Sequence, residues 1–154
     1  MVGADVAHLP APFDHDGAGA GGAGVSGTVE PLARLGRAEE ALNAARLLYS
    51  GGFPRDSVNR AHLAMELAAL AMLTRHGFGS KSHRGVQALF FEHVAKPGLM
   101  PMEHAQALAA ALRDRLLTDY EEPAADVTRD RAAKHLANAE RFLADVRSLL
   151  TAAS

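Results

Sequence analysis

The sequence predicts an all-α protein: an up-and-down bundle of four to five helices behind a disordered Gly/Ala-rich N-terminal tail. Apolar residues recur at three- and four-residue intervals from residue 28 onward. No segment in that region alternates apolar and polar residues as a half-buried strand does. Clusters of Gly and Pro separate the helical segments. We therefore expect a tail over residues 1–27 and one helical domain over residues 28–154.

The tail is predicted from composition. It contains the run Gly17-Ala-Gly-Ala-Gly-Gly-Ala-Gly24, and it has no Lys or Arg. Such a segment buries too little apolar surface to offset the entropy lost on ordering. It lacks the basic start and apolar centre of a secretion signal. No apolar run approaches the ~20 residues that span a bilayer, so we expect a cytoplasmic protein with no membrane contact.

Composition also limits the chemistry. The chain has no Cys, which excludes disulfides, thiol catalysis and zinc–thiolate sites. Its formal net charge is −2, and without the three Asp of the tail 16 basic and 15 acidic residues remain. A basic domain would be typical of broad nucleic-acid binding. Any RNA contact is therefore expected to be local.

The first two helices are bounded by clear signals. The first is expected over residues 29–49, with an apolar stripe, and Ser50-Gly51-Gly52 ends it. Pro54 suits the first turn of the second helix, which should run to about His76.

The remaining helices follow the same logic. A third is expected over residues 83–94, between Gly77-Phe-Gly79 and Lys96-Pro97-Gly98. Pro101 opens a fourth, which Glu121-Glu122-Pro123 interrupts. Thr128 is the expected N-cap of the fifth. Its apolar residues form a bundle seam, for which plain packing is the favoured interpretation: Ala132, Leu136, Ala139, Leu143, Val146 and Leu150.

The second helix has apolar residues on two sides. One stripe is Val58, Ala61, Met65, Ala69 and Met72, and a second is Leu63, Leu67 and Leu70. Such a helix is central or packs on a partner. We expect a homodimer through this helix and its neighbours.

A polar line, Asn59, His62 and Glu66, runs between the two stripes. His62 and Glu66 are expected to share a hydrogen bond. They offer two metal ligands, but the sequence shows no third, so no metal site and no cofactor are expected.

The segment Arg115-Leu-Leu-Thr-Asp119-Tyr120 carries the most distinctive charges. At 100° per residue, Arg115 and Asp119 lie on the side of Leu108 and Leu112, whereas Asp114 lies elsewhere. An arginine fixed by an aspartate can present its guanidinium to a phosphate. From spacing alone the alternative is favoured, a structural ion pair that fixes the bundle register. The phenol of Tyr120 could donate a hydrogen bond to a phosphate or be modified itself, but a ring that covers the core, with its hydroxyl in water, is the favoured interpretation.

Lys81-Ser82-His83 precedes the third helix. Lys81 and His83 could hold an anion at a helix N-terminus. Equally, Ser80 or Ser82 caps the helix and His83 is exposed.

In order along the chain, several motifs resemble the HEPN domain (higher eukaryotes and prokaryotes nucleotide-binding), in its small stand-alone prokaryotic branch. They are Ala41-Leu-x-x-Ala-Arg-Leu-Leu48, Asn59-Arg60-Ala61, Ala64-Met65, Lys81-Ser82-His83-x-Gly85-Val86, Arg115-x-x-x-Asp119-Tyr120 and Ala139-x-x-Phe142-Leu143. The resemblance covers roughly residues 33–150.

This resemblance implies four main helices plus a shorter one, usually in a dimer. Many members are paired with a minimal nucleotidyltransferase as toxin and antitoxin. Active members are metal-independent ribonucleases with an R-x(4–6)-H motif, in a cleft at the dimer interface. Arg115 matches the motif arginine, and the resemblance adds Asn59 and Arg60 to the candidate binding residues.

The chain departs from the family pattern at two places. Tyr120 stands where the motif has histidine, and a tyrosine with an ordinary pKa near ~10 is a poor general base at neutral pH. His83 could replace that imidazole if the third and fourth helices meet. His62 and Glu66 occupy places where the family usually has aromatic residues, and Glu66 would repel RNA phosphate. In some related domains the partner transferase adds AMP to a tyrosine, for which Tyr120 is the candidate.

Three functions remain open from the sequence. The first is a module that binds a nucleotide or RNA phosphate near Arg115 and Lys81, with a nucleotidyltransferase partner. The second is a metal-independent endoribonuclease toxin that uses Arg115 with His83 or Tyr120. The third is a non-catalytic helical scaffold. Convergence of Arg115, Lys81 and His83 favours the first two, whereas Arg115 sealed against Asp119 or Glu66 favours the third.

Overall fold

The computed structural model describes the backbone of residues 16–118 and 127–152, and side chains from residue 30 onward within those ranges. The described elements are helical: α3 (Asp16–Ser50), α4 (Pro54–Arg75), α5 (His83–Phe90), the π-helical turn η1 (Phe91–Ala95), α6 (Met102–Leu117) and α7 (Arg129–Ala152). The predicted all-α bundle, with four long helices and a shorter one, is confirmed.

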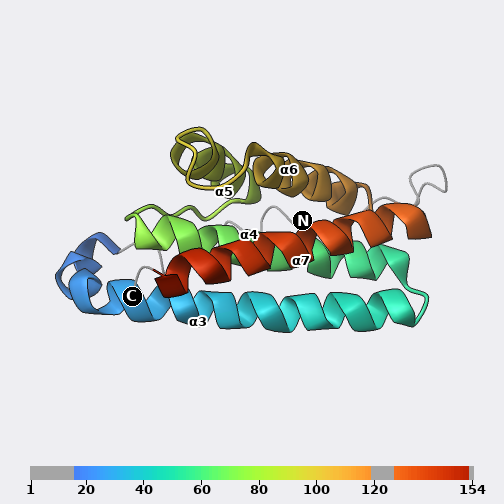
Figure 1. The fold of residues 1–154 in the computed structure, drawn as a ribbon, viewed down its shortest axis with the longest axis horizontal. Helices are drawn as coiled ribbons and strands as arrows, with labels where there is room; N and C mark the ends of the chain where they lie inside the picture. Colours follow the sequence, from blue (N-terminus) through green and yellow to red (C-terminus); the bar gives the residue numbers. More distant parts are fainter. Residues whose placement is uncertain (1–15, 119–126, 153–154) are drawn as a thin grey trace.

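The three longest helices form the body of the molecule. In Figure 1, α3, α4 and α7 run side by side along the long axis, and α5 and α6 cover one side of them. Helix α4 contacts α3, α5, η1, α6 and α7. It is therefore the central element, as its two apolar stripes predict.

The core lies along α4. All five residues of its first stripe are buried: Val58, Ala61, Met65, Ala69 and Met72. Of the second stripe, Leu70 is buried, and Leu63 and Leu67 are half-buried against the same core. The second stripe is thus covered largely within one chain. It gives no separate support for a dimer, which stays a prediction.

The turns follow from local chemistry. The chain reverses between α3 and α4 at Gly52, whose φ of +88° is strained for any residue with a Cβ. Pro54 occupies the first turn of α4. Ser82 caps α5 by accepting from the N–H of Gly85 at 2.9 Å, and Thr128 accepts from the N–H of Arg131 at 3.1 Å at the start of α7. Both predicted caps are confirmed.

The start of α3 and the burial of Asp114 differ from what the sequence predicts. Helix α3 begins at Asp16, before the expected residue 29, and the rest of the predicted tail lies outside the described residues. Asp114, expected away from the buried side of α6, is only 2 % exposed. That expectation is wrong because α6 packs against both α4 and α7, so its buried arc extends to the side of Ala107, Ala111 and Asp114.

Candidate functional site

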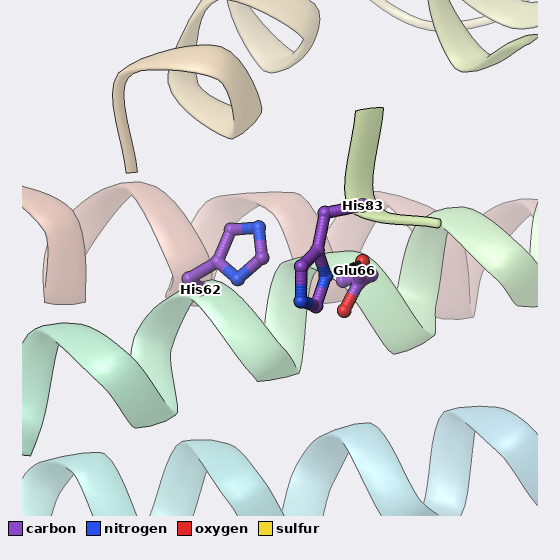
Figure 2. Close-up of side chains that lie close together, drawn as sticks. All are labelled: His62, Glu66 and His83. Atoms are coloured by element: carbon purple, nitrogen blue, oxygen red, sulfur yellow. Dashed lines mark hydrogen bonds and ion pairs between the residues drawn. The ribbon is translucent and has the colours of Figure 1, made fainter. Parts of the chain in front are cut away.

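Four side chains from three helices meet where α4, α5 and α6 adjoin. We call them the imidazole cluster: His62 and Glu66 on α4, His83 at the start of α5, and Arg115 near the end of α6. His62 and Glu66 are one turn apart on α4 and buried, whereas His83 and Arg115 are half-buried. Figure 2 shows His83 reaching from α5 to the two α4 side chains.

Arg115 contacts His62. Nη1 of Arg115 donates to Nδ1 of His62 at 3.1 Å. An arginine can only donate, so Nδ1 of His62 accepts and the imidazole is neutral. Burial is the main cause that lowers the pKa of His62 from 6.5 to about 4. The negative charge of Glu66 opposes this shift only in part, and the positive charge of Arg115 adds to it.

His83 pairs with Glu66. Nδ1 of His83 lies 2.6 Å from Oε2 of Glu66, and the rings of His83 and His62 meet edge to face at 5.5 Å between centroids. Burial alone would raise the pKa of Glu66, but the hydrogen bond to His83 and the nearby cations lower it overall. Glu66 is therefore an ionised carboxylate whose hydrogen-bond partner is His83.

These contacts correct two sequence expectations. Glu66 bonds His83 rather than His62, because α5 brings a second imidazole to the outer side of Glu66 while Arg115 engages His62 from α6. His83 is half-buried rather than exposed, because it turns toward α4 after the Ser82 cap. Its placement also supplies the third potential metal donor that the sequence did not reveal.

A second polar group lies one turn away on α4. Thr118 Oγ1 donates to the side-chain oxygen of Asn59 at 3.0 Å and also lies 2.7 Å from the carbonyl of Arg115. Arg55 donates to the carbonyl of Thr118 at 2.6 Å. Asn59 thus binds the C-terminal end of α6, three residues after Arg115.

The other candidate residues lie outside the imidazole cluster or outside the described residues. Lys81 and Arg60 are exposed. Asp119 and Tyr120 lie outside the described residues, so neither an ion pair of Arg115 with Asp119 nor a role of Tyr120 is described. A hollow between α6 and α7, lined by residues such as His104 and Arg141, includes none of the predicted site residues.

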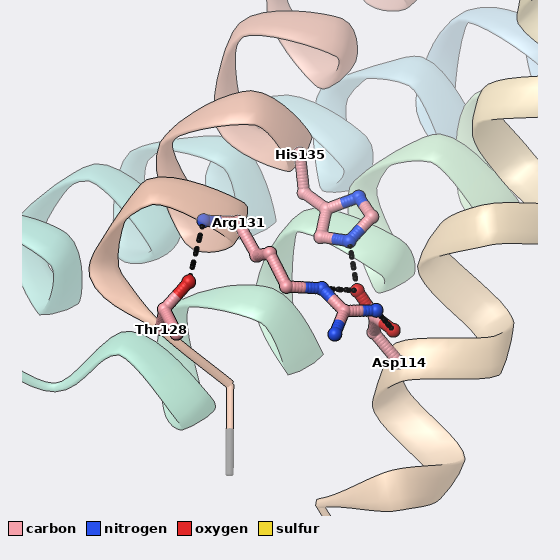
Figure 3. Close-up of polar contacts among 4 residues, drawn as sticks. All are labelled: Asp114, Thr128, Arg131 and His135. Atoms are coloured by element: carbon pink, nitrogen blue, oxygen red, sulfur yellow. Dashed lines mark hydrogen bonds and ion pairs between the residues drawn. The ribbon is translucent and has the colours of Figure 1, made fainter. Parts of the chain in front are cut away.

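The sequence did not predict a polar network that joins α6 to α7. Asp114 accepts from Arg131 at 2.5 and 3.1 Å and lies 2.6 Å from Nε2 of His135 (Figure 3). His135 stands three residues after Ala132 and four before Ala139, both on the predicted seam. This spacing could have predicted the network, because an imidazole on a buried seam needs a hydrogen-bond partner that is also buried.

Residues 32–149 match the HEPN domain. A UPF0332 protein of Gloeobacter violaceus is 35% identical over 116 residues, which are 75% of this chain and 92% of that protein. A UPF0332 protein of Pyrococcus horikoshii is 36% identical over 80 residues, covering 52% of this chain and 56% of that protein.

A third relative has a more informative name. A protein of Methanocaldococcus jannaschii named "Putative toxin MJ0605" is 28% identical over 115 residues, which are 73% of this chain and 83% of that protein.

Within the described part of the chain, every helix is too short or too polar to traverse a lipid bilayer.

Proposed function

Because the chain belongs to the HEPN domain family, we propose that it is a toxin-like HEPN module whose imidazole cluster binds RNA phosphate or a nucleotide through Arg115. The archaeal relative named as a toxin supports the toxin-like role. The partner proposed is a minimal nucleotidyltransferase, as the family resemblance implies.

The observation that carries the proposal is the bond between Arg115 and a neutral His62. A carboxylate at that place would neutralise the guanidinium, whereas a neutral imidazole fixes it and leaves its charge available. A fixed guanidinium is suited to the planar, two-point recognition of phosphate oxygens. Glu66, the anion that would repel a phosphate, is engaged by His83 at 2.6 Å.

A second candidate function, metal-independent RNA cleavage, is supported by the same His83–Glu66 pair. A carboxylate on Nδ1 fixes the tautomer and orientation of an imidazole, which leaves Nε2 to take up or deliver a proton. Arg115 would then stabilise the charge that develops on the phosphate. His83 thereby takes the place of the motif histidine.

The test compares Arg115→Ala with Arg113→Ala, an exposed arginine two residues away on the same helix. We expect Arg115→Ala to weaken the affinity for a labelled single-stranded RNA by about tenfold or more in fluorescence anisotropy. Growth arrest on expression should be lost as well. Arg113→Ala should behave like the natural chain, and equal binding by the two variants contradicts the proposal.

His83→Ala distinguishes the two functions. If the cluster only binds, this variant leaves RNA unchanged in length, as the natural chain does. If the cluster cleaves, the natural chain shortens RNA in the presence of a chelator, and His83→Ala stops the reaction while retaining binding. Cleavage that survives His83→Ala removes His83 from the mechanism. Co-purification with the nucleotidyltransferase encoded by a neighbouring reading frame tests the partner.

A further inference from the structure

The geometry points to a transition-metal site formed by His62, Glu66 and His83, suited to Zn²⁺ or an ion of similar preference. Each residue offers one donor atom, and the three atoms lie within 4.8 Å of one another. Figure 2 shows the three side chains gathered between α4 and the start of α5. The site goes beyond the proposed function, which requires no metal.

The donor set fits such an ion. Two imidazole nitrogens and one carboxylate oxygen are the ligands of many zinc sites with an open fourth position. Donors bound to one Zn²⁺ lie about 3.3 Å apart, given Zn–N distances of about 2.0–2.1 Å in tetrahedral geometry. Nδ1 of His83 and Oε2 of Glu66 are 2.6 Å apart, so this pair must open slightly, whereas donors near the 4.8 Å limit must draw closer. The half-buried His83 ring, on the first turn of α5, is the most exposed of the three side chains and is the one that can make that adjustment.

The surroundings also provide access and rigidity. His62 and Glu66 stand one turn apart on the central helix, and both are buried, at 1 % and 8 % exposed. The side chain of His83 is 23 % exposed, so an ion and a coordinated water can reach the site from its side. A metal site needs its ligands in place and an entry path, and this arrangement offers both.

Metal binding and the Arg115–His62 bond exclude each other. Nδ1 of His62 accepts from Arg115, so an ion on Nδ1 displaces the guanidinium directly. An ion on Nε2 places the remaining ring hydrogen on Nδ1, which then can no longer accept. In both cases Arg115 is released from His62, so the metal controls the side chain proposed to bind phosphate.

The metal alone provides the first test. The full chain, stripped with a chelator and dialysed, is titrated with Co²⁺ in visible absorption and with Zn²⁺ in calorimetry. We expect one ion per chain. Glu66→Gln, which keeps the shape of the side chain, and His83→Ala each remove a ligand. Each should weaken binding by at least the roughly 10- to 100-fold that is typical for loss of an outer-shell partner of a ligand. The control His76→Ala, an exposed residue after α4, should bind as the natural chain does.

Arg115→Ala provides the second test, with an effect opposite to that on RNA. Removing the competing hydrogen bond should tighten Zn²⁺ binding by about 2- to 10-fold, whereas the proposed function expects the same variant to lose RNA affinity. Far-UV circular dichroism verifies that each variant is folded. Equal Zn²⁺ affinity in Glu66→Gln, His83→Ala and the natural chain overturns the site, and so does absence of stoichiometric binding by the natural chain. An unchanged affinity in Arg115→Ala overturns the coupling to Arg115.

Discussion

His62 is a buried imidazole influenced by charged groups of four helices. Glu66 on its own helix favours the imidazolium, whereas Arg115 on α6, His83 on α5 and His135 on α7 oppose it. Burial is the largest influence, and the resulting pKa is about 4. At neutral pH the ring is therefore an acceptor, which is what allows it to hold a guanidinium.

The low pKa of His62 has a measurable consequence for stability. Below pH 6.5 the unfolded chain takes up a proton at His62, whereas the folded chain does not until about pH 4. Folding stability therefore falls as the pH drops through this window. From pH 7 to pH 5 we expect this residue to lower the free energy of unfolding by about 2 kcal/mol.

The measurement is urea unfolding at several pH values with a chelator present. In His62→Gln the decline between pH 7 and pH 5 should be shallower by that amount. The lowered pKa of Glu66 acts in the same direction, because a carboxylate with a depressed pKa loses its stabilising contribution only as the pH falls below its usual value near 4.5. Parallel pH profiles for His62→Gln and the natural chain would contradict the assignment.

At the scale of elements, the Asp114 network fixes the end of α6 to the start of α7. Asp114 is buried and bonds both Arg131 and His135, and these two side chains come from consecutive turns of α7. Arg115 is the next residue on α6, and Thr118, one turn later, is held by Asn59 of α4. The last turn of α6 is thus held by α7 and α4, and this positions Arg115 over His62.

Loss of Asp114 should be costly. Asp114→Ala leaves the buried His135 without its carboxylate, and breaking a buried pair from one side costs about 3 kcal/mol or more. Arg131 is half exposed, so Arg131→Ala, the matched control, should cost about 1 kcal/mol or less. Urea unfolding followed by far-UV circular dichroism measures both. Equal costs would mean that His135 does not depend on Asp114.

At the scale of the whole molecule, the apolar surface of α4 is used within the chain. Helix α4 packs on all the other described helices, and its Leu63 and Leu67 are partly covered by the same core. The homodimer is therefore a prediction that rests on the resemblance to the family. The surface for it has to extend beyond this stripe, since stable dimers bury about 1,600 Å² in total.

The oligomeric state is directly testable. We expect twice the chain mass in light scattering coupled to gel filtration at micromolar concentration. Mixing the natural chain with Arg115→Ala tests whether the RNA site is shared between two chains or lies within one chain, because the two cases predict different RNA binding by the mixture. In mixtures of the natural chain with Arg115→Ala, a shared site gives RNA binding that departs from a simple proportion to natural chains. A monomer at these concentrations refutes the dimer.

From the sequence alone one can predict the helices, their breaks and caps, the apolar stripes of α4 and α7, and the candidate site residues. These features depend on periodicity and on chemistry within a few residues, as Pro54, Ser82 and Thr128 illustrate. The hydrogen-bond partners of the site residues are known only once the helices are packed together. Arg115 with His62, His83 with Glu66, and Asp114 with His135 each join different helices. Such pairs depend on how helices rotate and cross when packed, which no local spacing specifies.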